Sequence, residues 1–295
     1  MSPWLERSLS VICPSQLNLP EGVAVDADGV VWAGGADGEV YRIGGDLFVP
    51  VHVKLSGRLL GITAAPGGGL VVCASGERKV HRIGPDRQVT DIGPDDLVLP
   101  NFAAFDGDGR LYVTDSGHLD RRDGRLIRID ADGRHQVIAG GLAFANGLAF
   151  TPDFRQLYLA QSGDKDVLVL DIDAGGDVTG RRVAVSRERI GREIEGDTLT
   201  DGIALDEAGN LYITLPRIDQ VIVVTPGDEL VVVAADDGPA KGTEVIDYGQ
   251  VLRSPTNVAF GGEDRRDLYI ANLRTRHLAV GRARVPGLAL PGQAR

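Results

Sequence analysis

The sequence lacks the features that define several common protein classes. Among its 295 residues only Cys13 and Cys73 are cysteines, which is too few for a disulfide framework, and they form no zinc motif such as CxxC. The N-terminal residues lack the apolar core of a signal peptide, and no stretch approaches the length of a membrane span. We therefore expect a cytoplasmic protein that does not act at a membrane.

Positive charge is also in short supply. The chain has 31 Lys and Arg residues against 42 Asp and Glu residues, for a net charge of -11. This balance disfavours a nucleic-acid partner and favours attraction of cations. The 43% hydrophobic content is enough for a large core.

A repeated six-residue motif is what the chain has in abundance. Its copies read EGVAVD, LGITAA, NFAAFD, NGLAFT, DGIALD and TNVAFG, and they begin at the residues that we call the motif-start residues: Glu21, Leu60, Asn101, Asn146, Asp201 and Thr256. A second β-type string follows each copy and carries an aromatic residue or valine at an offset of 11, 11, 11, 12, 11 or 13 residues: Trp32, Val71, Tyr112, Tyr158, Tyr212 and Tyr269.

The repeats predict an all-β fold. Short apolar strings separated by Gly and Asp turns indicate antiparallel hairpins, and no convincing helix is visible. Six units of four strands match a six-bladed β-propeller better than a sandwich, because ring closure buries sheet faces and removes open ends. We expect one domain over 1–295, with a lead-in over 1–19 whose SLSVIC segment supplies the outer strand of the sixth blade, six repeats over 20–285 and a tail over 286–295.

The motif-start residues are the candidate functional residues. The first strand of a propeller blade lies closest to the axis, so these residues are expected at one mouth of the central channel. Four of them carry oxygen donors that suit a hard cation such as Ca²⁺, namely Glu21, Asn101, Asn146 and Asp201. Zinc is less suited, because no His or Cys falls at these positions. Turn propensity explains any one of the four but not all four at equivalent positions.

Acidic turns also recur in the chain. DADG at Asp26, DGDG at Asp106, DEAG at Asp206 and DADG at Asp130 superficially match calcium loops but lack the required glutamate and spacing. We expect them to be hairpin turns, with the first three on the face away from the site.

PEGVAVD, FANGLAF, TDGIALD and the terminal GLALPG, in this order, resemble the gluconolactonase and senescence-marker-protein (regucalcin) family of calcium-dependent six-bladed propellers. The resemblance extends roughly from residue 20 to residue 292. It implies that Glu21, Asn146 and Asp201 hold Ca²⁺ or another divalent cation such as Zn²⁺, Mn²⁺ or Mg²⁺, and that Asn101 lies at the metal or contacts substrate. The related diisopropyl fluorophosphatase uses the same four residue types, so the four residues do not by themselves select the reaction.

This resemblance implies metal-dependent hydrolysis of a lactone. The cation acts as a Lewis acid on the carbonyl oxygen, and Asp201 serves as general base for water or, alternatively, as nucleophile. Serine catalysis has little support, because no GxSxG motif occurs and Ser116 has no evident base. A phosphotriesterase of the diisopropyl fluorophosphatase type and a non-catalytic ligand-binding propeller remain as alternatives.

The substrate class is expected to be a small lactone or ester, bound by a monomer or small homo-oligomer. Sugar lactonases resembling regucalcin carry an arginine two residues before the third-blade asparagine, where this chain has Leu99, so an aldonolactone is less assured. Rim loops at the same mouth offer further substrate contacts from His118 and Asp120, and also from Gln161, Arg217 and Arg274. For each of these residues taken alone, a solvated loop position is the favoured interpretation, and His118 is expected to be a surface loop residue rather than an acid or base.

Overall fold

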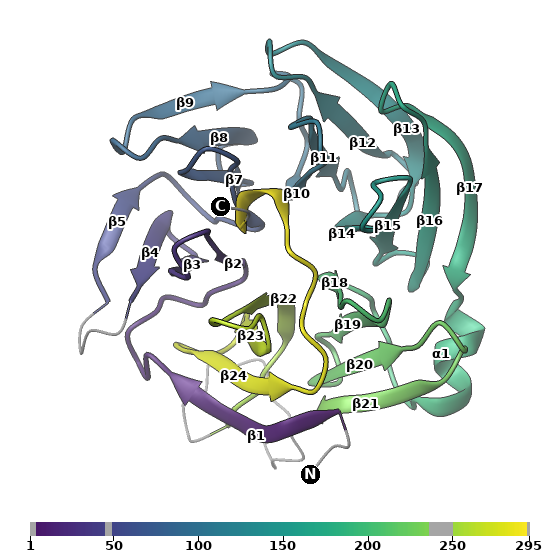
Figure 1. Cartoon of the computed structure of the whole chain (residues 1–295). Coiled ribbons are helices and arrows are strands. Elements are labelled where there is room, and N and C mark those ends of the chain that lie inside the picture. Colours follow the sequence, from purple (N-terminus) through teal and green to yellow (C-terminus); the bar gives the residue numbers. More distant parts are fainter. Residues whose placement is uncertain (1–3, 45–48, 236–249, 294–295) are drawn as a thin grey trace.

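The computed structural model describes residues 4–44, 49–235 and 250–293, and these form a six-bladed β-propeller (Figure 1). Six four-stranded antiparallel sheets stand around a central channel. The predicted fold class is therefore confirmed. Among the described residues, no helix has the length and apolar character needed to cross a membrane.

Each of the first five blades is built from four consecutive strands, ordered from the axis outward. The first three blades comprise β2 (Val23–Val25), β3 (Val31–Gly34), β4 (Glu39–Ile43) and β5 (Val51–Lys54), then β6 (Ile62–Ala64), β7 (Leu70–Ala74), β8 (Lys79–Ile83) and β9 (Val89–Ile92), then β10 (Pro100–Phe105), β11 (Leu111–Asp115), β12 (Gly124–Ile129) and β13 (His135–Leu142). The fourth and fifth comprise β14 (Ala145–Phe150), β15 (Gln156–Gln161), β16 (Asp166–Ile172) and β17 (Val178–Val185), then β18 (Ile203–Leu205), β19 (Leu211–Leu215), β20 (Gln220–Val224) and β21 (Leu230–Ala235).

The sixth blade joins the two ends of the chain. Its inner strands are β22 (Pro255–Gly261), β23 (Asp267–Asn272) and β24 (Leu278–Ala283), and its outer strand is β1 (Leu5–Ile12) from the N-terminus. Ile12 pairs with Leu278 and Leu5 with Ala283 in an antiparallel ladder. The N-terminal segment thus supplies the outer strand that closes the ring.

The strand register explains the two repeated signals of the sequence. The aromatic residue of each second strand pairs directly with the small residue at the fourth position of the preceding motif, as in Trp32 with Ala24 and Tyr112 with Ala104. The remaining pairs follow the same register: Val71 with Thr63, Tyr158 with Ala149, Tyr212 with Ala204 and Tyr269 with Ala259. A small residue leaves room beside a large cross-strand neighbour, so the two signals are two halves of one packing unit.

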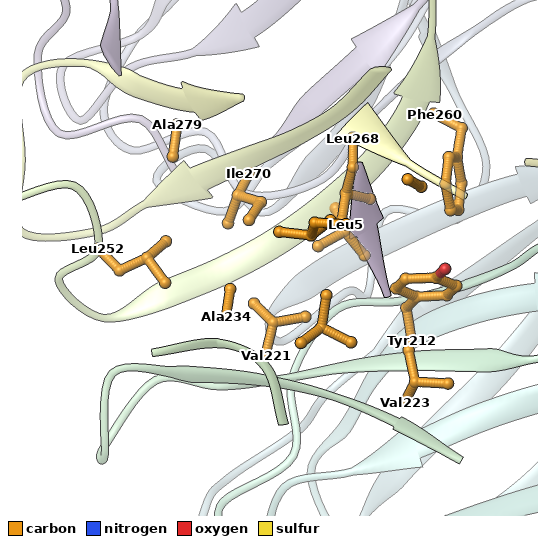
Figure 2. Packing of buried hydrophobic residues seen from close by; sticks show 13 residues of the cluster. Leu5, Tyr212, Val221, Val223, Ala234, Leu252, Phe260, Leu268, Ile270 and Ala279 are labelled. Carbon is orange, nitrogen blue, oxygen red and sulfur yellow. The ribbon is translucent and has the colours of Figure 1, made fainter. Parts of the chain in front are cut away.

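Buried side chains fill the space between adjacent blades. Figure 2 shows the cluster between the fifth and sixth blades, in which Tyr212 meets Phe260 edge to face with ring centroids 5.1 Å apart. Leu268 and the N-terminal Leu5 pack into the same cluster. Blade-to-blade packing of this kind buries both faces of each sheet.

Truncating Leu5 tests the ring closure. Leu5 is 3% exposed in this cluster, so Leu5→Ala is expected to lower the free energy of unfolding by about 2 to 5 kcal/mol through lost burial and a residual cavity. Val51→Ala is the control, because Val51 is 48% exposed on the outer strand of the first blade and its truncation should cost about 0.5 kcal/mol or less. Equal denaturation midpoints for both variants would contradict a closing role for β1.

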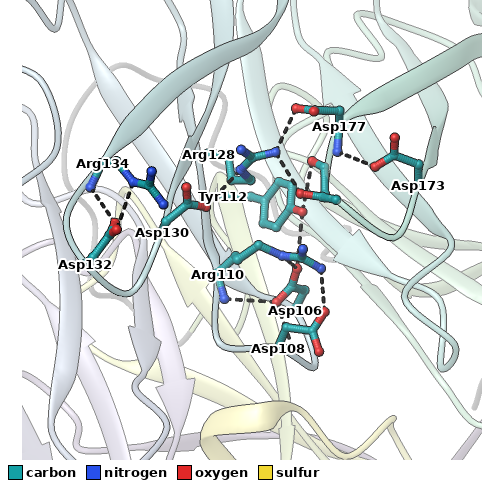
Figure 3. A network of polar contacts seen from close by, with 12 residues as sticks. Asp106, Asp108, Arg110, Tyr112, Arg128, Asp130, Asp132, Arg134, Asp173 and Asp177 are labelled. Atoms are coloured by element: carbon teal, nitrogen blue, oxygen red, sulfur yellow. Dashed lines mark hydrogen bonds and ion pairs between the residues drawn. The ribbon is translucent and has the colours of Figure 1, made fainter.

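The acidic turns organise hairpins at the channel end opposite the motif-start residues. Asp106 accepts hydrogen bonds from the backbone N–H groups of Asp108 and Arg110, and its second carboxylate oxygen accepts from Arg110 Nε and from the Tyr112 hydroxyl at 3.2 Å (Figure 3). Asp26 likewise accepts from the Trp32 indole at 2.7 Å. These aspartates are turn residues, and each also binds the aromatic residue six positions later.

One short helix departs from the predicted absence of helices. α1 (Arg187–Glu193) begins after Ser186, whose side chain accepts a hydrogen bond from Arg189 N at 3.1 Å. Ile190 and the C-cap residue Ile194 are buried against the fifth blade, and their spacing of four positions places both on the same face of the helix. With only two apolar anchors, the segment gave no clear periodic signal.

The C-terminal segment covers the channel end opposite the motif-start residues. It crosses the centre of the ring in Figure 1 and ends in the 3₁₀ helix η1 (Pro291–Gln293). Leu288 N donates to Leu205 O at 3.2 Å, and Gln293 Nε2 donates to Phe260 O at 2.9 Å. Together with the inner strands, the segment lines an apolar cavity inside the channel. Access for a polar ligand is therefore from the opposite end, which we call the site mouth.

Candidate functional site

The motif-start residues of neighbouring blades are linked to one another around the site mouth. Gly61 N donates to Asn101 O at 2.6 Å, and Gly147 N and Gly202 N donate in the same way to Asp201 O and Thr256 O. Two threonine hydroxyls complete further links: Thr114 Oγ1 donates to Asn146 O at 2.9 Å and Thr256 Oγ1 donates to Glu21 O at 2.9 Å. The structure thus brings residues that are far apart in sequence into one ring.

The glycine that follows several motif-start residues is required by this close approach. A Cβ atom on Gly22 would lie 2.2 Å from Leu60 O, and one on Gly202 would lie 2.4 Å from Thr256 O. Both distances are far shorter than a real Cβ contact. The small residue lets the inner strands converge enough for the motif-start side chains to share one mouth.

Glu21 and Asp201 place two carboxyl groups that interact electrostatically at this mouth. Burial raises the pKa of Glu21 well above its usual range, the charge of Asp201 raises it further, and Arg58 lowers it. Burial also raises the pKa of Asp201 to about 7, against the lowering effect of a hydrogen bond from Asn146. Among the described residues, Glu21 Oε2 is buried without a hydrogen-bond partner. Both carboxyl groups therefore lie where burial disfavours their charged forms, and Arg58 offsets this only in part at Glu21.

Two serines fix the direction in which the buried carboxamides point. Ser162 Oγ lies 2.6 Å from Thr200 O, so its hydroxyl must donate there and can only accept from Asn146 Nδ2, at 3.1 Å. Ser116 does the same for Asn101: it donates to Ala145 O at 2.6 Å and accepts from Asn101 Nδ2 at 3.0 Å. With each amide nitrogen held by a serine, each Oδ1 is left as an acceptor for the channel.

The donor set fits a hard divalent cation. Glu21, Asp201 and Asn146 offer two carboxylates and one oriented amide oxygen, and Asn101 offers a second amide oxygen. No group of three or more His, Cys, Asp or Glu side chains suited to a metal occurs among the described residues, so a cation at this mouth would need the amide oxygens in addition to the two carboxylates. A dication here would offset the repulsion between the two carboxylates.

The candidate rim residues pair with neighbours other than the motif-start residues. His118 is half exposed, and its Nδ1 lies 2.7 Å from Asp123 Oδ2, while the side chain of Asp120 is 86% exposed. Gln161 differs from the expectation of a substrate contact, because it is buried, accepts from Ala143 N and donates to Asp166. It holds the backbone that leads into the fourth motif instead. Arg217 is half exposed and paired with Asp197.

Three residues at this mouth were missed by the sequence reasoning. Ser162 occupies the repeat position of Ser116, four residues after the second-strand aromatic, and that shared offset was its available signal. Asn257 has a buried Oδ1 without a partner among the described residues. Arg58 has a buried Nη1 that likewise lacks a hydrogen-bond partner among the described residues, and its charge lowers the pKa of Glu21. No pattern in the sequence distinguishes Asn257 or Arg58 from other residues.

Cys73 lies close to the site, but its thiol is unreactive. It is fully buried in β7, and its pKa is raised by burial and then by the negative charges of Glu21 and Asp115. A thiol held protonated in this way is neither a nucleophile nor a metal ligand. Cys13 is partly buried, and burial raises its pKa too.

Comparison with known proteins agrees with this architecture. The family model described as "SMP-30/Gluconolactonase/LRE-like region" matches residues 49–274, and a model for the N-terminal part of strictosidine synthase-like proteins matches residues 8–43. A 6-deoxy-6-sulfogluconolactonase of Pseudomonas putida is 32% identical over 188 residues, which cover 58% of this chain and 57% of that protein. The chain spans about half the length of the curated relatives it matches.

Solved structures resemble the whole chain at lower identity. A gluconolactonase of Xanthomonas campestris aligns with a TM-score of 0.75 and 21% identity over 97% of this chain and 95% of its own. A calcium-binding protein, regucalcin, of Agrobacterium tumefaciens aligns with a TM-score of 0.73 and 17% identity over 97% of each chain. At these identities the likeness concerns the fold.

Proposed function

The chain belongs to the SMP-30/gluconolactonase/LRE-like family, and from this premise we propose that it is a lactonase that uses a divalent cation at the site mouth. The observation that carries the proposal is the buried pair Glu21 and Asp201, which lies beside oriented amide oxygens and includes an unpartnered carboxylate oxygen. Burying two carboxylates side by side costs free energy unless a positive charge accompanies them. Relatives named as sugar lactonases support the reaction class.

Glu21, Asn146 and Asp201 are the residues that would hold the cation, with Asn101 as a further ligand or a substrate contact. Ca²⁺ is the ion that this all-oxygen donor set favours, and the regucalcin neighbour is named as a calcium-binding protein. A bound dication supplies electrophilic polarisation of the lactone carbonyl and stabilises the charge that develops on its oxygen.

Asp201 is the residue that would accept the proton of the attacking water. Burial raises the pKa of Asp201 to about 7 in the metal-free protein, and a bound dication would lower it, which keeps the carboxylate ionised and able to accept a proton. Its backbone is fixed by Gly147 N, which donates to Asp201 O at 3.3 Å, and by Asp201 N, which donates to Thr214 O at 3.2 Å. These bonds hold the carboxyl at a constant position in the mouth, which favours proton transfer from a bound water.

A substrate panel tests the proposed function. Purified protein is depleted of metal and then assayed on five- and six-membered sugar lactones, a simple γ-lactone and a phosphotriester, with Ca²⁺, Mg²⁺, Mn²⁺ or Zn²⁺ added. We expect cation-dependent opening of at least one sugar lactone. Cleavage of the phosphotriester alone would assign a different reaction to the same residues, and inactivity on every substrate with tightly bound metal would indicate a binding protein.

Removing the serine that orients Asn146 should weaken metal binding. In Ser162→Ala the amide nitrogen loses one of its two acceptors and is held only by its hydrogen bond to Asp201, so the calorimetric Kd for Ca²⁺ is expected to rise about 10- to 100-fold, as for other partners of metal ligands.

Ser75→Ala is the matched control for this experiment. Ser75 occupies the same repeat position in the second blade, where the motif-start residue is Leu60 and offers no ligand. Its removal should leave the Kd for Ca²⁺ unchanged. Equal affinities in wild type and Ser162→Ala would mean that the serine does not position a ligand.

A further inference from the structure

Arg58 is a cationic side chain at the site mouth that the proposed hydrolysis does not use. It lies in the segment between β5 and β6, two positions before the motif-start residue Leu60. Leu99 holds the equivalent position in the third blade, two residues before Asn101. The second blade therefore places a guanidinium where the third blade has an aliphatic side chain.

The backbone of Arg58 is held firmly against the adjoining turn. Arg58 O accepts hydrogen bonds from Gly76 N and from Ser75 Oγ, both at 3.1 Å. A Cβ atom on Gly76 would lie 2.8 Å from Arg58 N, so the two segments are in direct contact. On the other side, Leu59 N donates to Gly35 O at 3.1 Å and Leu59 is fully buried. With the backbone on both sides held in this way, the side chain is the part of Arg58 that can contact a ligand.

The Arg58 guanidinium lies close to the motif-start residues, but part of its hydrogen-bonding capacity is unused. The charge of Arg58 acts on Glu21 and lowers its pKa. Its Nη1 is shielded from solvent and has no hydrogen-bond partner among the described residues. A buried guanidinium nitrogen without an acceptor is costly, so its location is best explained by an acceptor that arrives with a ligand.

The charges at the mouth specify what that ligand carries. A dication offsets the two negative charges of Glu21 and Asp201, and Arg58 then remains as a positive charge in excess. Arginine presents paired N–H donors that match the oxygens of a carboxylate, sulfonate or phosphate. We infer that Arg58 is a specificity-determining residue that binds an anionic substituent on the lactone. This inference rests on the proposed function and extends it to the substrate class of acidic sugar lactones.

Two lactones that differ in a single group provide the test. D-glucaro-1,4-lactone carries a carboxylate where D-glucono-1,4-lactone carries a hydroxymethyl group. Wild-type protein should show the higher kcat/KM for the carboxylate lactone. In Arg58→Gln this kcat/KM should fall on the order of 10- to 100-fold, chiefly through KM, as expected for loss of a hydrogen bond to a charged group. The neutral lactone should change less than about 3-fold, and Arg58→Lys should recover part of the preference.

Arg78→Gln is the matched control. Arg78 lies in the turn that follows β7, within the same blade and at the same mouth, but its side chain is exposed. The substitution removes the same charge and should leave the ratio of the two kcat/KM values unchanged. Metal content is measured in every variant, because a loss of cation would depress both lactones equally.

Binding of the open-chain products gives a readout that does not depend on turnover. The calorimetric Kd of metal-loaded protein should be lower for glucarate than for gluconate, and Arg58→Gln should remove this difference. An equal loss for both lactones, or no preference for glucarate in the wild type, would overturn the inference. Inactivity of the wild type on every lactone of the substrate panel, these two included, would refute the proposed function, and the two Kd values would then decide the role of Arg58 separately.

Discussion

Asp201→Asn is expected to reduce lactone hydrolysis by on the order of 10² to 10⁴, the usual contribution of a general base. The asparagine retains an oxygen that can bind a cation but cannot accept a proton from water. Because Asp201 is almost fully buried within the ring, no neighbouring solvent-exposed carboxylate can take its place in the same position. The measurement is kcat on the best lactone across a metal titration, with occupancy determined directly.

Controls separate proton transfer from charge at the same centre. Asn146→Asp adds a negative charge beside Asp201 and removes no candidate base, so it reports the combined effect of that charge and of the lost amide hydrogen bonds to Ser162 and Asp201. If fully metallated Asp201→Asn retains a near wild-type rate, Asp201 is only a ligand. The base would then be sought on the rim, beginning with His118, whose Nδ1 lies 2.7 Å from Asp123 Oδ2, and with Asp120.

Glu21→Gln should abolish stable metal binding. Glu21 supplies one of two carboxylates, and its Oε2 has no competing partner among the described residues. Partners of metal ligands are worth roughly 10- to 100-fold in affinity, so loss of a charged ligand should raise the Kd at least about 100-fold. Elemental analysis after mild purification and calorimetric titration with Ca²⁺ measure this directly. Hydrolysis should fall in parallel and return only in part at high metal concentration.

The stability of the same variant distinguishes a lost ligand from a misfolded protein. Glutamine has nearly the same shape as glutamate and removes a buried charge that lacks a partner. The metal-free variant should therefore be at least as stable as metal-free wild type in chemical denaturation. A clear loss of stability would indicate that Glu21 has a structural role, and unchanged metal content would contradict its assignment as a ligand.

The periodicity of the sequence allowed the fold to be predicted. Each blade repeats one packing unit, a small residue opposite an aromatic residue or valine, and its period survives changes in loop length. The helix α1 was missed for the opposite reason, since its two anchors, Ile190 and Ile194, occur once and belong to no repeat. A feature that repeats along the chain can be recognised in the sequence, whereas a feature that occurs once can be recognised only from its contacts in the structure.

The candidate site was predictable only in part. Glu21, Asn101, Asn146 and Asp201 stood out because they share one position in the repeat. Gln161 had seemed to be a rim contact, but its hydrogen bonds to Ala143 and Asp166 place it in the structural framework instead.

By itself, the sequence determined the number of blades, the strand order within them and which residues begin each inner strand, because these follow from local periodicity. Only the tertiary structure decided what surrounds those residues. It buried Glu21 and Asp201 together, which raises the pKa of both, and it directed Asn146 through Ser162 and the carbonyl of the neighbouring blade. It also left Arg58 Nη1 buried without a hydrogen-bond partner among the described residues. Such properties depend on contacts between residues far apart in the chain, and no local pattern encodes them.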